Sequence, residues 1–185
     1  MASADEQRPG VRPRATLGRR LDLAARHAFP ASITILLMLL TEAPFGVPDQ
    51  TTLLPAVALI SVWFWSLYRP GAMSPPVVFG IGLLLDLLDW LPFGTGVVTL
   101  LLVHGVALQW RRFLGRQGFI LVWLTFAAVA AGAAGLEWVA TAVLTWRLIP
   151  PGPAMFQATL CVALYPALAI MFARAHRSIA NPERA

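Results

Sequence analysis

Six long apolar runs separated by short connections constrain the fold of this chain more than any other feature. The runs cover residues 28–47, 52–68, 75–91, 95–110, 118–146 and 154–173. Only 12% of the residues are charged, whereas about 25% are charged in a typical soluble domain. A helix of roughly 20 apolar residues crosses a bilayer. The pattern therefore predicts an all-α integral membrane protein, built as a bundle of six transmembrane helices.

The arginines predict an orientation for this bundle. The chain has 14 basic residues, all of them arginine, and only Arg147 follows an odd-numbered run. The others precede the first run or follow the second, fourth and sixth runs: Arg8, Arg12, Arg14, Arg19, Arg20, Arg26, Arg69, Arg111, Arg112, Arg116, Arg174, Arg177 and Arg184. Because basic residues in short loops stay cytoplasmic, both termini are predicted to lie in the cytoplasm.

The basic character also bears on the class of partner. A formal net charge of +5 would suggest nucleic acid in a soluble protein, but these arginines flank the apolar runs. Orientation and attraction to anionic lipid explain them, so we expect no nucleic-acid partner. We expect an Arg-rich cytoplasmic tail (1–27), a six-helix transmembrane domain (28–175) and a cytoplasmic C-terminal tail (176–185). Residues 17–28 could form a short amphipathic helix on the membrane surface.

Tryptophans fall near the predicted membrane boundaries. Trp90 and Trp146 lie at outer edges of the runs, and Trp65, Trp110 and Trp123 lie at inner edges. Aromatic belts form at these levels of a membrane protein. The tryptophan pattern therefore predicts the same boundaries as the arginine pattern.

The fifth run is crowded with small residues. Ala128 and Gly132, and likewise Ala131 and Gly135, are four residues apart and share a helix face. Such faces let another helix approach closely inside a membrane. We expect these residues to pack inside the bundle, with a contact to another subunit as the alternative.

Four acidic residues lie in the runs or at their ends: Glu42, Asp86, Asp89 and Glu137. Counting along each run places all four in the outer half. Since a carboxylate in hydrocarbon costs several kcal/mol unless it is paired, hydrated or protonated, we expect one hydrated or partner-filled region, with Arg147 near its rim. Asp86 and Asp89 share a helix face; they either cap groups at the turn between the third and fourth runs, or line a surface for a partner helix or small ligand.

The residues that enzymes use are not arranged here in a catalytic pattern. The single Cys161 lies in an apolar run, which excludes an intramolecular disulfide and a cysteine-based metal site. The sequence has no Gly-rich phosphate loop and no nucleophile elbow. Three serines of the runs have no recognisable base: Ser32, Ser61 and Ser66. We therefore expect a protein that is not an enzyme.

The three histidines give no metal site. His104 lies in the middle of the fourth run and is expected to form a hydrogen bond with a neighbouring helix. His27 and His176 lie in flanking segments. We accordingly expect no metal and no cofactor.

One segment resembles a known family. Residues 79–89, FGIGLLLDLLD, followed by Leu91-Pro92-Phe93-Gly94, are similar to the F-x-x-G-L-x-x-D … P-x-G signature of the rod shape-determining membrane protein family MreD. The likeness covers roughly residues 28–175. It implies a non-enzymatic, multi-pass protein of the bacterial inner (plasma) membrane that supports peptidoglycan synthesis and cell shape. It also implies a six-helix fold similar to the S components of energy-coupling-factor transporters.

The resemblance further implies a bitopic partner like the scaffold MreC, and through it indirect links to MreB, RodA and a class B penicillin-binding protein. A transmembrane helix of the partner would pack on glycine faces, and the outer acids would fix its orientation. The predicted partner-binding residues are Gly82, Asp86, Pro92 and Gly94, with Asp89 and Glu137 as neighbours. The alternative function is a small-molecule-binding, S-component-like subunit of a membrane transporter, in which the acids line a pocket for a small cation.

Overall fold

The structure, a computed structural model, describes residues 17–43, 52–89, 92–147 and 149–180. All regular secondary structure in these ranges is helical, which confirms the predicted all-α fold. The helices are α1 (Leu17–Glu42), α2 (Leu53–Tyr68), α3 (Pro75–Leu88), α4 (Thr95–Leu114), α5 (Phe119–Thr145) and α6 (Gly152–Ala180). Each helix matches one predicted apolar run. Residues 1–16 of the predicted tail, residues 181–185, and Trp90 and Leu91 lie outside the described residues.

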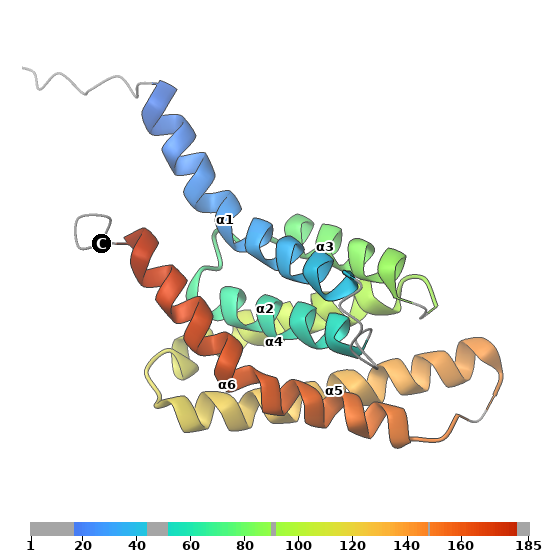
Figure 1. Cartoon of the computed structure of the whole chain (residues 1–185). Helices are drawn as coiled ribbons and strands as arrows, with labels where there is room; N and C mark the ends of the chain where they lie inside the picture. The colour runs from blue at the N-terminus through green and yellow to red at the C-terminus, as the bar shows by residue number, and fades with distance from the viewer. Residues whose placement is uncertain (1–16, 44–51, 90–91, 148, 181–185) are drawn as a thin grey trace, which may run out of the picture.

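Successive helices run in opposite directions, so that α1 begins and α6 ends at the same end of the bundle (Figure 1). We call this the basic end, because Arg69 follows α2 there and three arginines lie at the end of α4 and just after it: Arg111, Arg112 and Arg116. The opposite end is called the acidic end. It holds the ends of α1 and α3 and the second half of α5, and hence Glu42, Asp86, Asp89 and Glu137. The expectation that these acids lie at a common level is therefore met.

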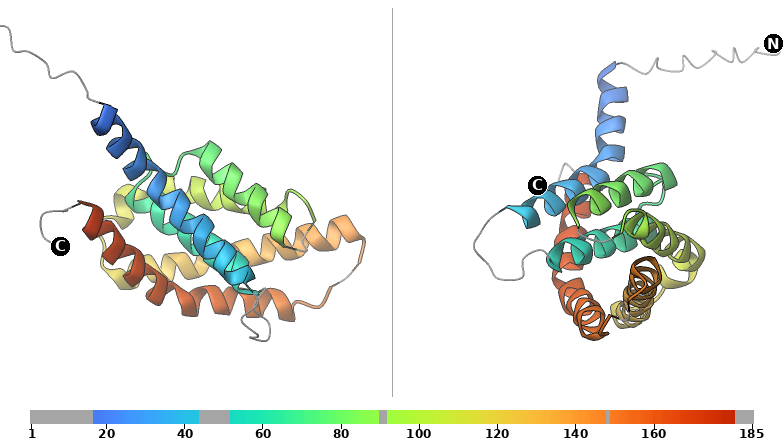
Figure 2. Two further views of the ribbon diagram at one scale, coloured as in Figure 1. Left: turned by 45° about the horizontal axis from the view of Figure 1, so that its top comes forward. Right: turned by 90° about the vertical axis from the view of Figure 1, so that its right-hand side faces the viewer.

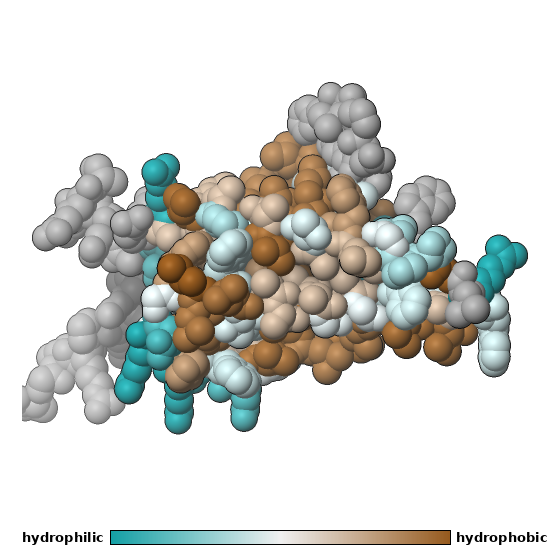
Figure 3. Space-filling view, turned by 90° about the horizontal axis from the view of Figure 1, so that it is seen from below, coloured by the Kyte–Doolittle hydropathy of each residue, from teal (hydrophilic) through white to brown (hydrophobic). Residues whose placement is uncertain are grey.

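Three helices are long and apolar enough to cross a membrane: residues 95–114, 119–145 and 152–176. The apolar parts of the other three helices are shorter, and the 16 residues of α2 extend over only about 24 Å. Seen from the side of α5 and α6, the surface is apolar between two polar ends (Figure 3). The structure is thus that of a helical protein suited to a membrane, whereas six complete spans and their orientation stay predictions.

The core is built around α2. This helix contacts α1, α3, α4 and α6, and 12 of its 16 residues are buried, which makes it the central helix of the bundle. The ring of Trp65 lies 5.4 Å from that of Phe172 on α6, and the ring of Trp63 lies 6.0 Å from that of Phe126 on α5. A helix enclosed by neighbours must be apolar all round, as this one is.

This central position of α2 overturns one expectation about the tryptophans. Trp65 is fully buried, so its prediction as a boundary residue is wrong: its ring packs in the core and has no lipid-facing side. Trp146 and Trp110 are 92% and 49% exposed, as membrane-boundary positions require. Trp123 is half-buried, and its Nε1 donates a hydrogen bond to the carbonyl of Val162 at 3.0 Å.

The first helix begins earlier than the apolar run that predicted it. Residues 17–27, expected as part of the tail and as a candidate short amphipathic helix, are helical, and they continue into the apolar segment as one helix. Pro30 lies inside this helix and cannot donate a backbone hydrogen bond, and the Thr34 hydroxyl donates to the Pro30 carbonyl at 2.7 Å. The helix changes direction along its length in both figures (Figures 1 and 2), as a proline inside a helix explains.

Candidate functional site

Asp86, in the last turn of α3, caps the start of α4. Its carboxylate accepts hydrogen bonds from the backbone N–H groups of Gly94 at 2.9 Å, Gly96 at 2.7 Å and Val97 at 3.3 Å. The first N–H groups of a helix have no partner inside that helix, and a negative charge there also interacts favourably with the helix dipole. Asp86 is only 2% exposed, so these donors compensate the burial of its carboxylate.

The turn between α3 and α4 depends on glycine. Gly94 has a φ of +94°, in the left-handed region that residues with a side chain rarely adopt. The Thr95 hydroxyl donates a hydrogen bond to the carbonyl of Pro92 at 2.7 Å. Both features direct the backbone N–H groups of the turn toward α3, where Asp86 accepts them.

Two further glycines let α3 and α4 approach closely. A Cβ atom on Gly96 would lie 2.6 Å from Oδ1 of Asp86, and a Cβ atom on Gly82 would lie 2.7 Å from the Cα of Val97. Real Cβ contacts of this length essentially never occur. Gly82, Gly94 and Asp86 therefore act within the chain, where they join α3 to α4.

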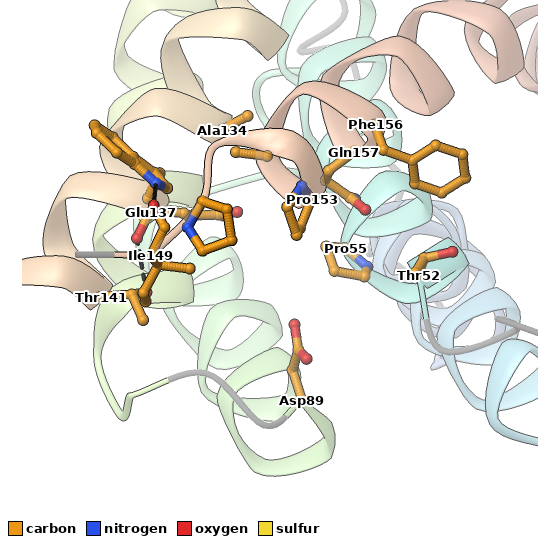
Figure 4. A pocket seen from close by; sticks show the side chains of 13 residues that line it. Thr52, Pro55, Asp89, Ala134, Glu137, Thr141, Ile149, Pro153, Phe156 and Gln157 are labelled. Carbon is orange, nitrogen blue, oxygen red and sulfur yellow. Dashed lines mark hydrogen bonds between the residues drawn. The ribbon is translucent and has the colours of Figure 1, made fainter. Parts of the chain in front are cut away.

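A cavity of about 310 Å³ opens at the acidic end, beside this hairpin (Figure 4). We call it the acidic-end cavity. Its walls come from the ends of α2, α3, α5 and α6 and from the connection between α5 and α6. Most of the lining is apolar and includes three prolines, two alanines, an isoleucine and a phenylalanine. The side chains with polar atoms are Thr52, Asp89, Glu137, Trp138, Thr141 and Gln157.

Hydrogen bonds fix two walls of the acidic-end cavity. Trp138 Nε1 donates to the carbonyl of Ile149 at 2.9 Å, which ties the connection after α5 to that helix. When the Gln157 amide is oriented with its nitrogen toward Thr52, this nitrogen donates a hydrogen bond to the Thr52 carbonyl at 3.1 Å. The amide oxygen then accepts a hydrogen bond from the Ala56 N–H at 3.2 Å. The Gln157 side chain on α6 thus binds the first turn of α2. These contacts define the shape of the cavity before any ligand binds.

Two carboxyl groups face the acidic-end cavity, one from α5 and one from the residue that follows α3. Glu137 on α5 is largely buried and interacts electrostatically with Asp89 at the end of α3 and, more weakly, with Asp86. Arg147 is exposed and does not line the cavity.

The predicted site residues form two adjoining groups. Four of them take part in the α3–α4 hairpin: Gly82, Asp86, Pro92 and Gly94. The other two, Asp89 and Glu137, line the acidic-end cavity. Of the two alternatives for the aspartates, capping is confirmed for Asp86, whereas Asp89 lines the acidic-end cavity. Binding of a partner by these residues stays a prediction.

A buried histidine–serine pair joins two other helices. Nδ1 of His104 on α4 lies 2.7 Å from Oγ of Ser66 on α2, which confirms the predicted hydrogen bond to a neighbouring helix. The expectation that Ser66 lacks a nearby base is wrong, since the two residues are brought together from positions 38 apart. Ser66 is 0% and His104 3% exposed, so no substrate reaches the hydroxyl and the pair holds α2 against α4.

The small residues of α5 divide between two faces. Ala130, Ala133 and Ala134 are buried in the bundle. The two pairs singled out from the sequence are exposed, so the expectation that they pack inside is wrong: Ala128 and Gly132, Ala131 and Gly135. A Cβ atom added to either glycine meets no atom within 4 Å. Beside this open face, a groove of about 210 Å³ lies between α5 and α6.

Sequence reasoning missed three residues that shape these sites: Gly96, Trp138 and Gln157. Gln157 carried a signal, because it is the one amide side chain between residues 152 and 173, within an apolar run. Comparisons with protein-family models, with curated proteins and with solved structures find no match for this chain. Across the described ranges, histidine, cysteine, aspartate and glutamate side chains form no group of three or more that could hold a metal ion.

Proposed function

We propose that this chain is a non-enzymatic scaffold of the bacterial cell-elongation machinery, as its resemblance to the MreD family implies. In this proposal all six helices lie in the inner membrane and both termini are cytoplasmic. The protein binds the single transmembrane helix of an MreC-like partner. Through that partner it acts with MreB, RodA and a class B penicillin-binding protein in peptidoglycan synthesis and cell-shape maintenance.

The observation that carries this proposal is the open small-residue face of α5. Lipid tails are as apolar as leucine, so helices associate in a membrane through close packing rather than through hydrophobic burial. Gly132 and Gly135 leave the α5 backbone accessible, and the groove toward α6 continues this surface past Ala154 and Ala158. A single helix of a partner fits such a surface better than a bulky soluble domain does.

The hairpin residues support the same proposal indirectly. The Asp86 cap and the close approach at Gly82 hold α3 against α4, and α4 in turn contacts α5. The MreD-like segment would then determine the position of the α5 face without touching the partner. This assigns the segment a role in the shape of the scaffold.

The test is recovery of a co-expressed MreC-like partner with affinity-tagged variants. Gly132→Leu and Gly135→Leu add a large side chain to the open face, at positions where a Cβ atom meets nothing within 4 Å, and should reduce recovery several-fold. Gly105→Leu is the matched control, because a Cβ at that exposed position on α4 also meets nothing within 4 Å. Leucine is a better helix former than glycine, so none of the three should destabilise its helix.

Equal partner recovery with all three leucine variants, together with normal rod shape, would contradict the proposed contact. Crosslinking offers a second readout. In a Cys161→Ser background, a single cysteine at position 132 should crosslink to the partner helix and one at position 105 should not. Reporter fusions to the two termini test the cytoplasmic orientation separately.

A further inference from the structure

We propose that the acidic-end cavity is a binding site for a small organic cation, a compound with an amine or a quaternary ammonium group. This inference goes beyond the scaffold function and does not depend on it. It follows from the size of the cavity, from the charges that face it and from the apolar character of its walls.

The size of the cavity suits a small ligand. Ligand pockets have volumes of about 300–1,000 Å³, and the acidic-end cavity, with about 310 Å³, lies at the lower limit of that range. A water molecule occupies about 30 Å³ in the liquid, so the space corresponds to roughly ten non-hydrogen atoms. Choline and short diamines are of this size.

The charges that face the cavity are of one sign. Glu137 lies on α5 and Asp89 directly follows α3, and their carboxyl groups face the same space (Figure 4). The connections at this end, residues 43–52, 89–94 and 146–151, contain one basic residue, Arg147, which is exposed and does not line the cavity. A cation placed between the two carboxyl groups would interact favourably with both of them when they are ionised.

The walls favour an organic cation over a metal ion. Proline, alanine and isoleucine side chains make up much of the lining, and aromatic rings are contributed by Trp138 and Phe156. A cation near the face of an aromatic ring is stabilised by about 0.5–2 kcal/mol. The indole of Trp138 is already held in place by its hydrogen bond to Ile149. Calcium requires six to eight oxygen ligands, which this largely apolar lining does not offer.

The polar side chains at the α2–α6 side complete the site. The Gln157 amide is hydrogen-bonded to the first turn of α2, which joins α6 to α2 at this wall. The cation would contact the two carboxylates, and its hydrocarbon part would lie against Pro55, Pro153 and Ile149. The site therefore combines an apolar cavity with a few convergent polar groups, the usual composition of a ligand pocket.

The test is isothermal titration calorimetry on the full-length, detergent-purified protein. The probes are choline and 1,4-diaminobutane, each paired with a neutral compound of the same shape, 3,3-dimethylbutan-1-ol and butane-1,4-diol. At least one cation should bind saturably, and its neutral counterpart should bind at least about tenfold more weakly. Asp89→Asn and Glu137→Gln should each weaken cation binding by about tenfold or more.

Glu42→Gln is the matched control, since Glu42 is an acid of the same end that does not line the cavity. This variant should bind the cation as the parent protein does. The proposal is overturned if neither cation binds saturably up to about 10 mM, a concentration far above that at which a specific pocket is filled. It is also overturned if the neutral compounds bind equally well, or if sodium alone abolishes binding at equal concentration. If one carboxylate variant fails to fold, the other carboxylate variant and the comparison of each cation with its neutral counterpart still test the proposal.

Discussion

Replacement of Asp86 by alanine gives the most direct test of the way α3 and α4 are joined. The substitution removes the acceptor of three backbone N–H groups at the start of α4 and leaves these donors inside the bundle. No other described side chain is recorded as an acceptor for the N–H groups of Gly94 and Gly96. We therefore expect Asp86→Ala to destabilise the whole bundle and to loosen the first turn of α4.

The magnitude follows from the hydrogen-bond lengths. A hydrogen bond to a charged group contributes about 1.5–3 kcal/mol in a soluble protein, whereas hydrogen bonds between membrane helices average about 0.6 kcal/mol. The bonds from Gly96 at 2.7 Å and Gly94 at 2.9 Å are short, and the bond from Val97 at 3.3 Å is weak. At about 1–1.5 kcal/mol for each short bond, between those limits, the loss is about 2–3 kcal/mol.

Two measurements check this value. The free energy of unfolding in mixed detergent should fall by about 2–3 kcal/mol for Asp86→Ala and by about half as much for Asp86→Asn, which keeps one acceptor oxygen. Hydrogen exchange read by mass spectrometry should show faster exchange of the amides of residues 94–97. Asp89→Asn is the matched control, because it removes the same charge one turn later without removing these hydrogen bonds.

An unchanged unfolding free energy for Asp86→Ala, with the amides of residues 94–97 still protected, would refute the capping argument. Equal destabilisation by Asp89→Asn would also refute it, since a general effect of charge at the acidic end would then explain both variants. The pattern across the three variants therefore separates a directed cap from simple electrostatics.

Two more substitutions test the packing of the bundle. Gly82→Ala should destabilise the bundle by about 1–3 kcal/mol, because the added Cβ would lie 2.7 Å from the Cα of Val97. Gly80→Ala lies on an open face of the same helix and should be neutral or slightly stabilising. Thermal unfolding of the two variants distinguishes these effects. Ser66→Ala should cost about 1–3 kcal/mol by leaving Nδ1 of His104 unpaired, and the double variant with His104→Leu should recover part of that loss in the same assay.

The sequence predicted the helices well, because each apolar run is bounded by proline, glycine or charged residues. The main departure is that the short amphipathic helix considered for residues 17–28 is not separate but forms the start of α1. Residues 17–27 lack the apolar character that marks a span, yet they continue the helix, since the first hydrogen-bonded turns of a helix favour extension over a new start. Apolar character shows where a helix can lie in lipid and does not show where the helix begins.

The sequence contains much less information on which helices lie next to one another in the bundle. Trp65 looked like a boundary residue because it lies near the end of its run, but its burial depends on which helices surround α2. Ser66 and His104 meet because α2 and α4 lie side by side, and nothing local to either residue indicates this. The exposure of Gly132 and Gly135 likewise depends on which helices cover α5.

The candidate site was foreseen in part. The three-residue spacing of Asp86 and Asp89 suggested a shared role, whereas the structure assigns the first to a hairpin and the second to a cavity. The difference arises because α3 ends at Leu88, so Asp89 has an extended backbone conformation and no longer follows the helical spacing. A spacing argument holds only as far as the helix extends.

The enclosure of α2 has a consequence for biosynthesis. Its innermost aromatic side chains, Trp63 and Trp65, pack against Phe126 of α5 and Phe172 of α6, and both of these helices are synthesised after α2. The two tryptophans therefore lack part of their core contacts until α5 and α6 have been made. A chain cut off before Phe172 would leave one side of Trp65 without its aromatic neighbour from α6.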